Sequence, residues 1–226
     1  MRRRIHAIGG GAALATFVLF TLLVRFCDRS AIGPQESLVG LARFNAAVRE
    51  IIGTCDWART LSSLAGMIAL ATVPFYACLG CWQLVSRRSL KAVDPALPRL
   101  AAYYAVLALV YVLFEALCIN CRPVLEADGT LEASYPSTHA LLAITLPGAS
   151  WLVCRRWLAA SGLRTAVFAA HAAVAFVILA GRVASGVHWG TDIIGGMLLG
   201  WALLEGLALA LPSGEDASDR ARNAAE

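Results

Sequence analysis

The stretch GRVASGVHWGTDIIGGMLLGWALLEGLALAL, residues 181–211, decides the fold of this chain. An α-helix needs about 20 apolar residues to cross the hydrocarbon core of a bilayer, and residues 189–211 supply such a run. The same stretch contains Arg182, His188 and Asp192, although ionisable side chains inside membrane segments are rare and usually functional. It therefore predicts a membrane helix with a polar site at its beginning.

The rest of the chain has the same character. Of its 226 residues, 59% are hydrophobic and 15% are charged, and the mean hydropathy is +0.68, which excludes an ordinary soluble globular domain. Six apolar runs are long enough to span a membrane: residues 5–24, 61–85, 97–117, 137–154, 164–183 and 189–211. We predict an all-α, polytopic membrane bundle of six transmembrane helices, forming one domain over residues 1–211 with its motifs in residues 97–211.

The two ends of the chain are predicted to differ. The apolar run after MRRR is longer than the roughly 7–15 residues of a signal-peptide core, so residues 5–24 are expected to be a retained signal anchor. The last segment, PSGEDASDRARNAAE, residues 212–226, is small, polar and charged. That composition is typical of a disordered tail, here expected to be cytoplasmic.

Residues 37–52, between the first two spans, carry apolar side chains at helical spacing: Leu38, Leu41, Phe44, Val48 and Ile51. The pattern predicts an amphipathic helix. Such a helix can lie in the membrane interface, or it can simply pack over the outer ends of the bundle.

Arginine and lysine gather in three short segments, residues 2–4, 87–91 and 155–164. Short basic loops stay in the cytoplasm, so this distribution predicts a multi-pass protein of a bacterial inner (plasma) membrane with both termini cytoplasmic.

The same topology places three polar segments at the outer ends of spans three to six. These are Arg122, residues 136–139 and residues 182–192. We expect them to form one shared site on the periplasmic side.

Two C-x-x-C pairs, Cys78 with Cys81 and Cys118 with Cys121, suggest a zinc site. The predicted topology separates the pairs by a membrane thickness, so no zinc site is expected. On the outer side a disulfide can form in an oxidising compartment, and the sequence leaves the pairing open among Cys27, Cys55, Cys118 and Cys121.

His188 and Asp192 are four residues apart and would share one face of a helix. The carboxylate can then accept a hydrogen bond from one imidazole nitrogen, which fixes the tautomer and leaves the other nitrogen free to attack or to move a proton. The alternative is a hydrogen-bonded pair that only anchors the end of a helix.

The tetrapeptide PSTH adds a second histidine. Pro136 and Ser137 are typical of a helix beginning, where the free amides of the first turn form an anion site. Capping alone does not explain His139, because the helix dipole disfavours a cationic histidine there unless an anion lies beside it.

Arg122 and Arg182 supply permanent positive charge. Their planar guanidiniums match phosphate or carboxylate oxygens, although either one alone could be an interfacial anchor. Two arginines, two histidines, a carboxylate and a helix beginning on one face indicate phosphoryl transfer. In that chemistry arginines and amides hold the phosphate oxygens, one histidine attacks and the other protonates the leaving oxygen.

In order and spacing these residues resemble the signature of the type 2 phosphatidic acid phosphatases, the membrane branch of the acid phosphatase and vanadium haloperoxidase superfamily. That signature reads K-x6-R-P, P-S-G-H and S-R-x5-H-x3-D. Here the matching residues are Arg122-Pro123, Pro136-Ser137-Thr138-His139, and Arg182 followed by His188 and Asp192.

The resemblance implies a role for each matching residue. His188 would be the nucleophile that forms a phosphohistidine, Asp192 would orient it, and His139 would be the general acid. The phosphate would be bound by Arg122, Arg182, Ser137 and Thr138. The resemblance implies no metal or other cofactor, and the sequence shows no cluster of acids that would hold one.

Three positions depart from the signature. Glu115 stands where the family has lysine, seven residues before Arg122 and thus expected on a similar helix face two turns deeper. There it could orient Arg122 or Arg182, or stay protonated. Thr138 replaces a glycine, and Gly181 replaces a serine. The departures predict an altered substrate preference or a reduced rate.

The remaining polar residues receive simpler interpretations. His171, in the middle of a span, is expected to hydrogen-bond to a neighbouring helix. Glu126, Asp128 and Glu132 would repel an anionic substrate and are expected to be solvated, and Trp189 fits the aromatic belt at the interface.

The expected function is that of an integral-membrane lipid phosphatase acting on a lipid phosphate or pyrophosphate. Candidate substrates are undecaprenyl pyrophosphate, phosphatidic acid, phosphatidylglycerol phosphate and lipid A phosphate. The alternatives are a lipid phosphotransferase and a non-catalytic lipid-binding or scaffold relative. The expected partners are the substrate and membrane lipids, with no nucleic acid, and the oligomeric state is left open.

Overall fold

The computed structural model describes residues 1–126 and 128–212, so residues 213–226 of the predicted tail lie outside the described part. The described residues form eight α-helices and two short 3₁₀ helices. The α-helices are α1 (Arg2–Phe26), α2 (Ala42–Ile52), α3 (Asp56–Leu70), α4 (Thr72–Arg87), α5 (Ala96–Leu117), α6 (Thr138–Cys154), α7 (Ser161–Ala184) and α8 (Gly190–Ala210); the 3₁₀ helices are η1 (Pro34–Glu36) and η2 (Leu90–Ala92).

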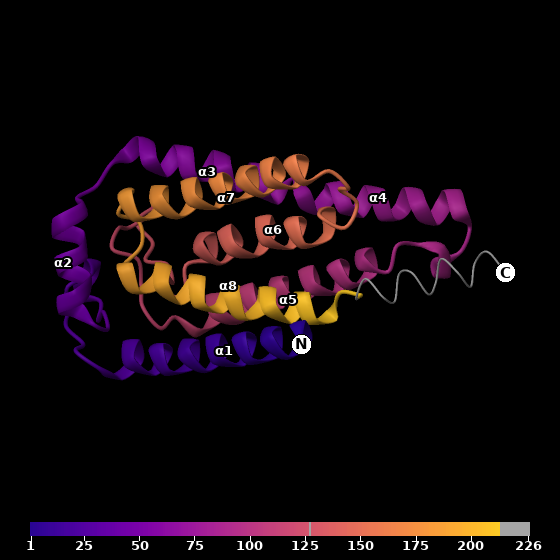
Figure 1. Cartoon of the computed structure of the whole chain (residues 1–226). Helices are drawn as coiled ribbons and strands as arrows, with labels where there is room; N and C mark the ends of the chain where they lie inside the picture. The colour runs from indigo at the N-terminus through magenta and orange to yellow at the C-terminus, as the bar shows by residue number, and fades with distance from the viewer. Residues whose placement is uncertain (127, 213–226) are drawn as a thin grey trace.

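The predicted all-α membrane bundle is confirmed. Within the described residues, five segments are long and apolar enough to cross a membrane, namely α1, α5, α7, α8 and the continuous pair α3–α4, which spans Asp56–Arg87. The sixth predicted span is α6, a shorter apolar helix of 17 residues. Figure 1 shows α6 in the middle of the bundle, where neighbours bury most of its side chains.

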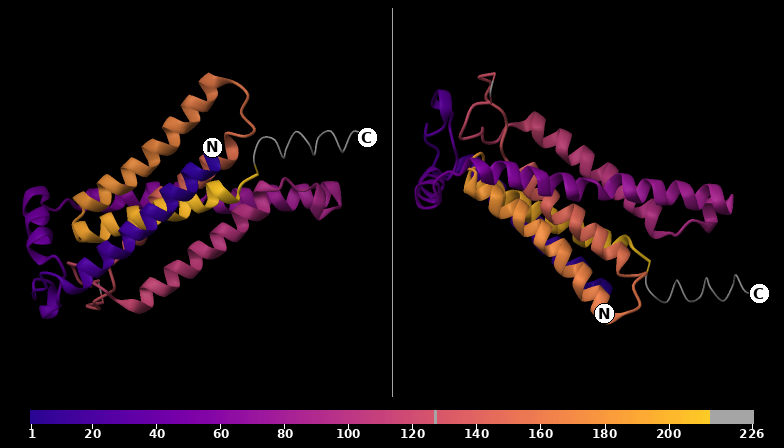
Figure 2. Two further views of the ribbon diagram at one scale, coloured as in Figure 1. Left: turned by 60° about the horizontal axis from the view of Figure 1, so that its bottom comes forward. Right: turned by 90° about the horizontal axis from the view of Figure 1, so that it is seen from above.

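The long helices run roughly side by side, and α2 lies across one end of the bundle, here called the α2 end (Figure 1). Helix α8 packs against α1 and α6, and α7 packs against α3 and α6. The α2 end collects the last turns of α1, α5 and α7 and the first turns of α3, α6 and α8. Figure 2 shows that the segment after α5 also lies beside α2 there.

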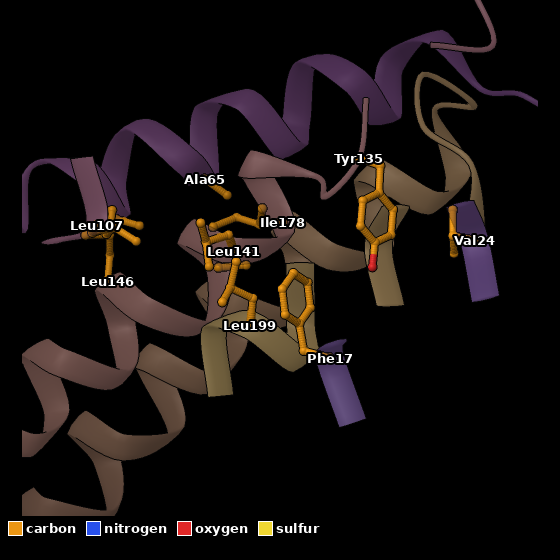
Figure 3. Close-up of a cluster of buried hydrophobic side chains, with 11 residues drawn as sticks. Phe17, Val24, Ala65, Leu107, Tyr135, Leu141, Leu146, Ile178 and Leu199 are labelled. Atoms are coloured by element: carbon orange, nitrogen blue, oxygen red, sulfur yellow. The ribbon is translucent and has the colours of Figure 1, made fainter. Parts of the chain in front are cut away.

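The apolar core lies under the α2 end and includes Phe17, Tyr135, Leu141 and Leu199 (Figure 3). The ring of Tyr135 is 1% exposed and stacks on Phe17, with 6.4 Å between ring centroids. Its hydroxyl lies 2.8 Å from Thr21 Oγ1 on α1. Burial raises the pKa of Tyr135 to about 12, so the hydroxyl stays protonated and keeps its hydrogen bond.

Small residues let α8 approach its neighbours closely, as is common between membrane helices. A Cβ atom at Gly195 would lie 2.6 Å from the ring of Tyr135, and one at Gly196 would lie 2.5 Å from the carbonyl oxygen of Ser137. A side chain at either position would push α8 away from the beginning of α6. The glycines therefore fix the distance between the two helix beginnings that carry the predicted site.

Helix α2 begins at Ala42, later than the predicted amphipathic segment. Phe44 and Val48 face Gly190 at the beginning of α8, where an added Cβ would lie 3.2 Å from each of them. Asn45 is buried and accepts a hydrogen bond from the backbone nitrogen of Thr191 at 3.1 Å. Helix α2 therefore packs over the end of the bundle, which is one of the two interpretations that the sequence allowed.

Candidate active site

Hydrogen bonds join the three predicted polar segments at the α2 end. The backbone nitrogen of Ser137 donates to the carbonyl oxygen of Asp192 at 2.9 Å, which ties the beginning of α6 to that of α8. The indole nitrogen of Trp189 donates to the carbonyl oxygen of Cys121 at 2.8 Å, which ties α8 to the segment after α5. Segments far apart in the sequence thus form one structural unit.

His188 lies in the turn between α7 and α8 and not on a helix, because α8 begins at Gly190. The expectation of a shared helix face with Asp192 is therefore wrong. The carboxylate folds back and accepts a hydrogen bond from the backbone nitrogen of Trp189 at 2.9 Å, as the third residue of a helix often does. As a result Asp192 Oδ2 lies 3.7 Å from His188 Nδ1, which is close for two charges but too long for the expected hydrogen bond.

His139 lies in the first turn of α6, opposite His188. Ser137 caps this helix as predicted, and its Oγ accepts a hydrogen bond from the backbone nitrogen of Ala140 at 3.3 Å. The ring centroids of His139 and His188 are 6.4 Å apart. At this distance a phosphate can lie between the two rings. One ring would then be about 3 Å from phosphorus, as a nucleophile must be, and the other would be within hydrogen-bond reach of the leaving oxygen, as an acid must be.

Arg182 reaches the site from the last turn of α7. The residue is 4% exposed, and its Nη2 donates to Ser63 Oγ on α3 at 2.8 Å. His139 also faces α3, with its Cδ2 4.0 Å from where a Cβ of Gly66 would be. Helix α3 therefore forms one wall of the site, and Ser63 is a contact that the sequence did not reveal.

Arg122 lies outside any helix. Helix α5 ends at Leu117, and Cys118 adopts a left-handed conformation with φ 31°. The backbone nitrogen of Arg122 then donates to the carbonyl oxygen of Glu132 at 2.9 Å. The expectation that Glu115 and Arg122 share a helix face is therefore wrong, because the chain turns between them.

Two carboxylates form ion pairs with the guanidinium of Arg122. Its Nη1 donates to Glu126, and its Nη2 lies 3.1 Å from Glu132 Oε2. The expectation that these acids are solvated is wrong for Glu126, whose side chain is 23% exposed, because the turn of the chain after Arg122 brings it back to the guanidinium. Glu132 also contacts Arg122, but its side chain stays 42% exposed. Asp128 is exposed as expected, and the hydrogen bond from Thr130 Oγ1 holds the pKa of its carboxyl below the usual range.

Arg59, in the first turn of α3, is a further positive charge that the sequence did not single out. Its Nη2 lies 3.4 Å from Glu126 Oε2, and its charge interacts with His139 and Arg182. No motif surrounds Arg59 in the sequence. It enters the site only because α3 begins at the same end of the bundle as α6.

The site concentrates buried polar atoms without a partner among the described residues. Burying an unpaired polar atom is costly, and native proteins contain few such atoms. Six of them belong to the predicted residues: Arg122 Nε, Arg182 Nε, His139 Nδ1, His188 Nδ1, His188 Nε2 and Asp192 Oδ1. Such a cluster indicates a site that binds a polar ligand.

A small pocket opens beside His188. Its lining includes Glu115, Arg122, Tyr135 and Thr138. The pocket therefore brings the predicted nucleophile together with one predicted arginine and with Thr138. Arg182 and His139 approach from the side of α3.

The family model of the PAP2 superfamily matches residues 113–212, which contain all three polar segments. This segment of the chain is similar to the PAP2 superfamily. A solved structure with 17% sequence identity, the crystal structure of a transmembrane PAP2 type phosphatidylglycerolphosphate phosphatase from Bacillus subtilis, has a TM-score of 0.61 and covers 93% of this chain and 96% of its own. That likeness shows a shared fold, whereas a comparison with curated proteins finds no match. The match over residues 113–212 supports a phosphatase function.

The structure explains one departure from the PAP2 signature. A Cβ atom at Gly181 would lie 2.6 Å from Ser62 Cβ and 2.8 Å from the carbonyl oxygen of Ala58 on α3. The serine of the signature would not fit while α3 lies this close. The glycine thus permits the α3–α7 contact from which Ser63 reaches Arg182.

A second departure, Glu115, does not take the orienting role that the sequence suggested. The partners of Arg122 are Glu126 and Glu132, and the partner of Arg182 is Ser63. Glu115 remains exposed and lines the pocket beside His188. In this chain a carboxylate therefore faces the pocket from the last turns of α5.

Two further expectations have clear outcomes. His171 Nε2 lies 2.9 Å from Ser150 Oγ on α6, so the predicted hydrogen bond to a neighbouring helix is confirmed. Trp189 is only 4% exposed and lies under Arg49, with 5.7 Å from the guanidinium carbon to the ring centroid. The aromatic-belt expectation is therefore wrong, because this indole holds the site together from inside.

The cysteines are free thiols in the structure. Sγ of Cys118 and Sγ of Cys121 lie 3.1 Å apart, beside Arg122 in the sequence. Burial raises the pKa of the Cys121 thiol to about 11. Among Cys27, Cys55, Cys118 and Cys121, this is the pair that the fold brings into contact.

Proposed function

We propose that this chain is an integral-membrane lipid phosphatase that hydrolyses the terminal phosphate of a lipid phosphate or pyrophosphate through a phosphohistidine. One observation carries the proposal: the rings of His139 and His188 lie 6.4 Å apart at one end of an apolar bundle. Arg122 and Arg182 lie beside them. Two imidazoles facing each other next to two guanidiniums suit the transfer of a single phosphoryl group.

In the first step His188 Nε2 attacks phosphorus. A P–N bond forms while the P–O bond to the lipid breaks, and His139 gives its proton to the leaving oxygen. The carboxylate of Asp192, 3.7 Å from His188 Nδ1, stabilises the positive charge that develops on the ring.

In the second step water attacks the phosphohistidine. His139, now neutral, takes a proton from the water as the P–O bond forms and the P–N bond breaks. Inorganic phosphate then leaves, and both histidines return to their initial protonation states. One pair of histidines thus serves both halves of the reaction.

The phosphate oxygens would be held by Arg122, Arg182 and the beginning of α6 at Ser137 and Thr138. The first amides of a helix have no intrahelical acceptor and favour an anion. The buried Nε atoms of both arginines, which have no partner in the described part of the chain, are donors suited to the same oxygens.

We place the enzyme in the bacterial inner membrane with the α2 end on the periplasmic side. The basic segments that follow α4 and α6 lie at the opposite end of the bundle, and the positive-inside rule assigns such segments to the cytoplasm. Both termini would then be cytoplasmic. The six-helix domain of residues 1–211 is proposed to be the whole catalytic unit.

The substrate class is proposed from the chemistry of the site and from the structural relative. That relative is a phosphatidylglycerolphosphate phosphatase, and a terminal phosphate on a lipid is what two arginines and two histidines at a membrane surface can process. Phosphatidylglycerol phosphate, phosphatidic acid, undecaprenyl pyrophosphate and lipid A phosphate all present that group.

One observation favours a second candidate, lipid phosphotransfer. Glu115 lines the pocket beside His188, where a carboxylate can accept a hydrogen bond from the hydroxyl of an acceptor lipid. The acceptor oxygen would then take the place of water in the second step.

The test is a panel of these four lipids with purified protein in detergent, assayed for phosphate release with and without an acceptor lipid. A brief incubation with ³²P-labelled substrate should leave an acid-labile label on the wild type and none on His188→Ala. His6→Gln is the matched control, since His6 pairs with Glu205 on α8, away from the site. Release of inorganic phosphate without acceptor supports hydrolysis. Recovery of the phosphate on the acceptor lipid, with no release of inorganic phosphate, supports transfer, and neither activity on any lipid contradicts the proposal.

A further inference from the structure

We infer that Arg59 and Arg122 form a two-arginine phosphate site whose internal ligand is the carboxylate of Glu126. The inference rests on the proposed function, because the ligand that replaces the carboxylate is the terminal phosphate of the substrate. Arg59 then becomes a phosphate-binding residue, and Glu126 becomes a residue that sets specificity.

Glu126 lies between two guanidiniums that come from different parts of the fold. Its Oε1 accepts from Arg122 Nη1, and its Oε2 lies 3.4 Å from Arg59 Nη2. The Arg122–Glu126 pair is partly shielded from solvent, with side chains 18% and 23% exposed, whereas the side chain of Arg59 is 48% exposed. Carboxylate and phosphate present similar oxygen pairs to arginine, so a site that grips this carboxylate also fits a phosphate.

The Arg59–Arg122 site lies next to the proposed reaction centre. Arg122 lines the same pocket as His188. The charge of Arg59 interacts with both His139 and Arg182. An anion held by Arg59 and Arg122 is therefore within the electrostatic reach of the two histidines.

The competition by Glu126 has a consequence for lipid choice. The surrounding bilayer presents many phosphodiester headgroups, each with a single negative charge on its phosphate. Glu126 carries the same charge, and its position on the chain gives it a high effective concentration at the two arginines. A phosphodiester thus gains little by displacing it, whereas a terminal phosphate, with about −1.5 to −2 charge, binds two arginines more strongly. Glu126 thereby favours terminal phosphates over bulk phospholipids.

Two neighbouring acids provide matched comparisons. Glu132 contacts Arg122 with 3.1 Å between Nη2 and Oε2, but its side chain is 42% exposed and touches one arginine of the pair. Asp128 accepts hydrogen bonds from Thr130 and contacts neither arginine. Glu132→Gln should therefore have a smaller effect than Glu126→Gln, and Asp128→Asn should have none.

The experiment compares the wild type, Glu126→Gln and Asp128→Asn in detergent micelles. Glu126→Gln should lower the inhibition constant of inorganic phosphate about tenfold, as expected when one charged competitor for a guanidinium is removed. It should also make turnover sensitive to added phosphatidylglycerol, a phosphodiester, which inhibits the wild type little. The KM for a lipid phosphate should fall while kcat changes less, a separation that a loss of folding would not produce.

A second variant tests the role of Arg59. The double variant Arg59→Gln/Glu126→Gln should lose the gain in phosphate affinity that Glu126→Gln alone produces. Calorimetry with inorganic phosphate measures this affinity without turnover. If wild-type enzyme is active but Glu126→Gln binds phosphate no better than Asp128→Asn, the inference is overturned and the phosphatase proposal stands. If Glu126→Gln binds phosphate more tightly but no protein hydrolyses lipid phosphates, the proposed function fails and the anion site remains.

Discussion

Two histidine-centred clusters lie inside the bundle, and they differ in how completely their polar atoms are paired. In the cluster around His171, Nδ1 donates to the carbonyl oxygen of Val167 at 2.7 Å, and Nε2 lies 2.9 Å from Ser150 Oγ, which is also 3.0 Å from the hydroxyl of Tyr76. At the α2 end, neither ring nitrogen of His188 has a hydrogen-bond partner among the described residues.

The difference separates a structural role from a chemical one. A satisfied polar cluster links α4, α6 and α7 and has no donor or acceptor left for a ligand. An unsatisfied cluster costs stability, which a protein tolerates where the same atoms must bind and react. Residue type alone does not distinguish the clusters, since both contain histidine and serine. The pairing of their atoms does.

The largest effect is expected from Arg182→Ala. Removing one strong donor to a developing anion commonly lowers turnover by roughly 10²–10³-fold, and Arg182 is buried and its charge interacts with His139. Arg43→Ala is the control, because Arg43 is an exposed arginine at the same end that pairs with Asp28. Initial rates on the best lipid of the panel measure the effect; a loss of tenfold or less would argue against phosphate contact.

His171→Ala should lower stability and leave turnover nearly unchanged, the opposite of what is expected for Arg182→Ala. The variant loses the link to Ser150, and hydrogen bonds between membrane helices contribute on average about 0.6 kcal/mol, up to about 1.7. We expect the thermal unfolding midpoint to fall by a few degrees while turnover stays within about twofold of the wild type. A large loss of turnover at unchanged stability would remove the distinction between the two clusters.

A third prediction concerns Glu115, which faces the pocket where the PAP2 signature has lysine. Glu115→Lys replaces a charge that repels the phosphate with one that attracts it, so we expect a several-fold lower KM for a lipid phosphate. Glu115→Gln should lower the KM by a smaller factor, because it removes the repulsion without adding attraction. Loss of activity in both variants would show instead that the carboxylate takes part in the reaction.

The membrane bundle and the convergence of the polar segments could be predicted because each depends on local information. Hydropathy over about 20 residues identifies a span, and the alternation of spans determines which segments share an end. Arg122, His139 and His188 therefore meet as expected, although no single segment describes the site.

The internal geometry could not be predicted, because it depends on backbone turns and tertiary contacts. The end of α5 at Leu117 moves Arg122 off the helix. The capping of α8 by Asp192 moves the carboxylate away from His188. Glu126 meets Arg59 only through the packing of α3 beside the segment after α5. No sequence spacing encodes these contacts.

The smallest effect concerns Cys121, at the edge of the unsatisfied cluster. Its pKa is raised to about 11, first by burial and then by the neighbouring Cys118. A raised pKa means that the thiol stays protonated at pH values where an ordinary thiol, with a pKa near 8.5, is already ionised. Because the thiolate is the reactive form, alkylation of Cys121 by iodoacetamide should be slow at pH 8 and should keep rising through pH 10. Mass spectrometry of the labelled peptide measures this profile, and a plateau near pH 9 would show that burial does not control this thiol.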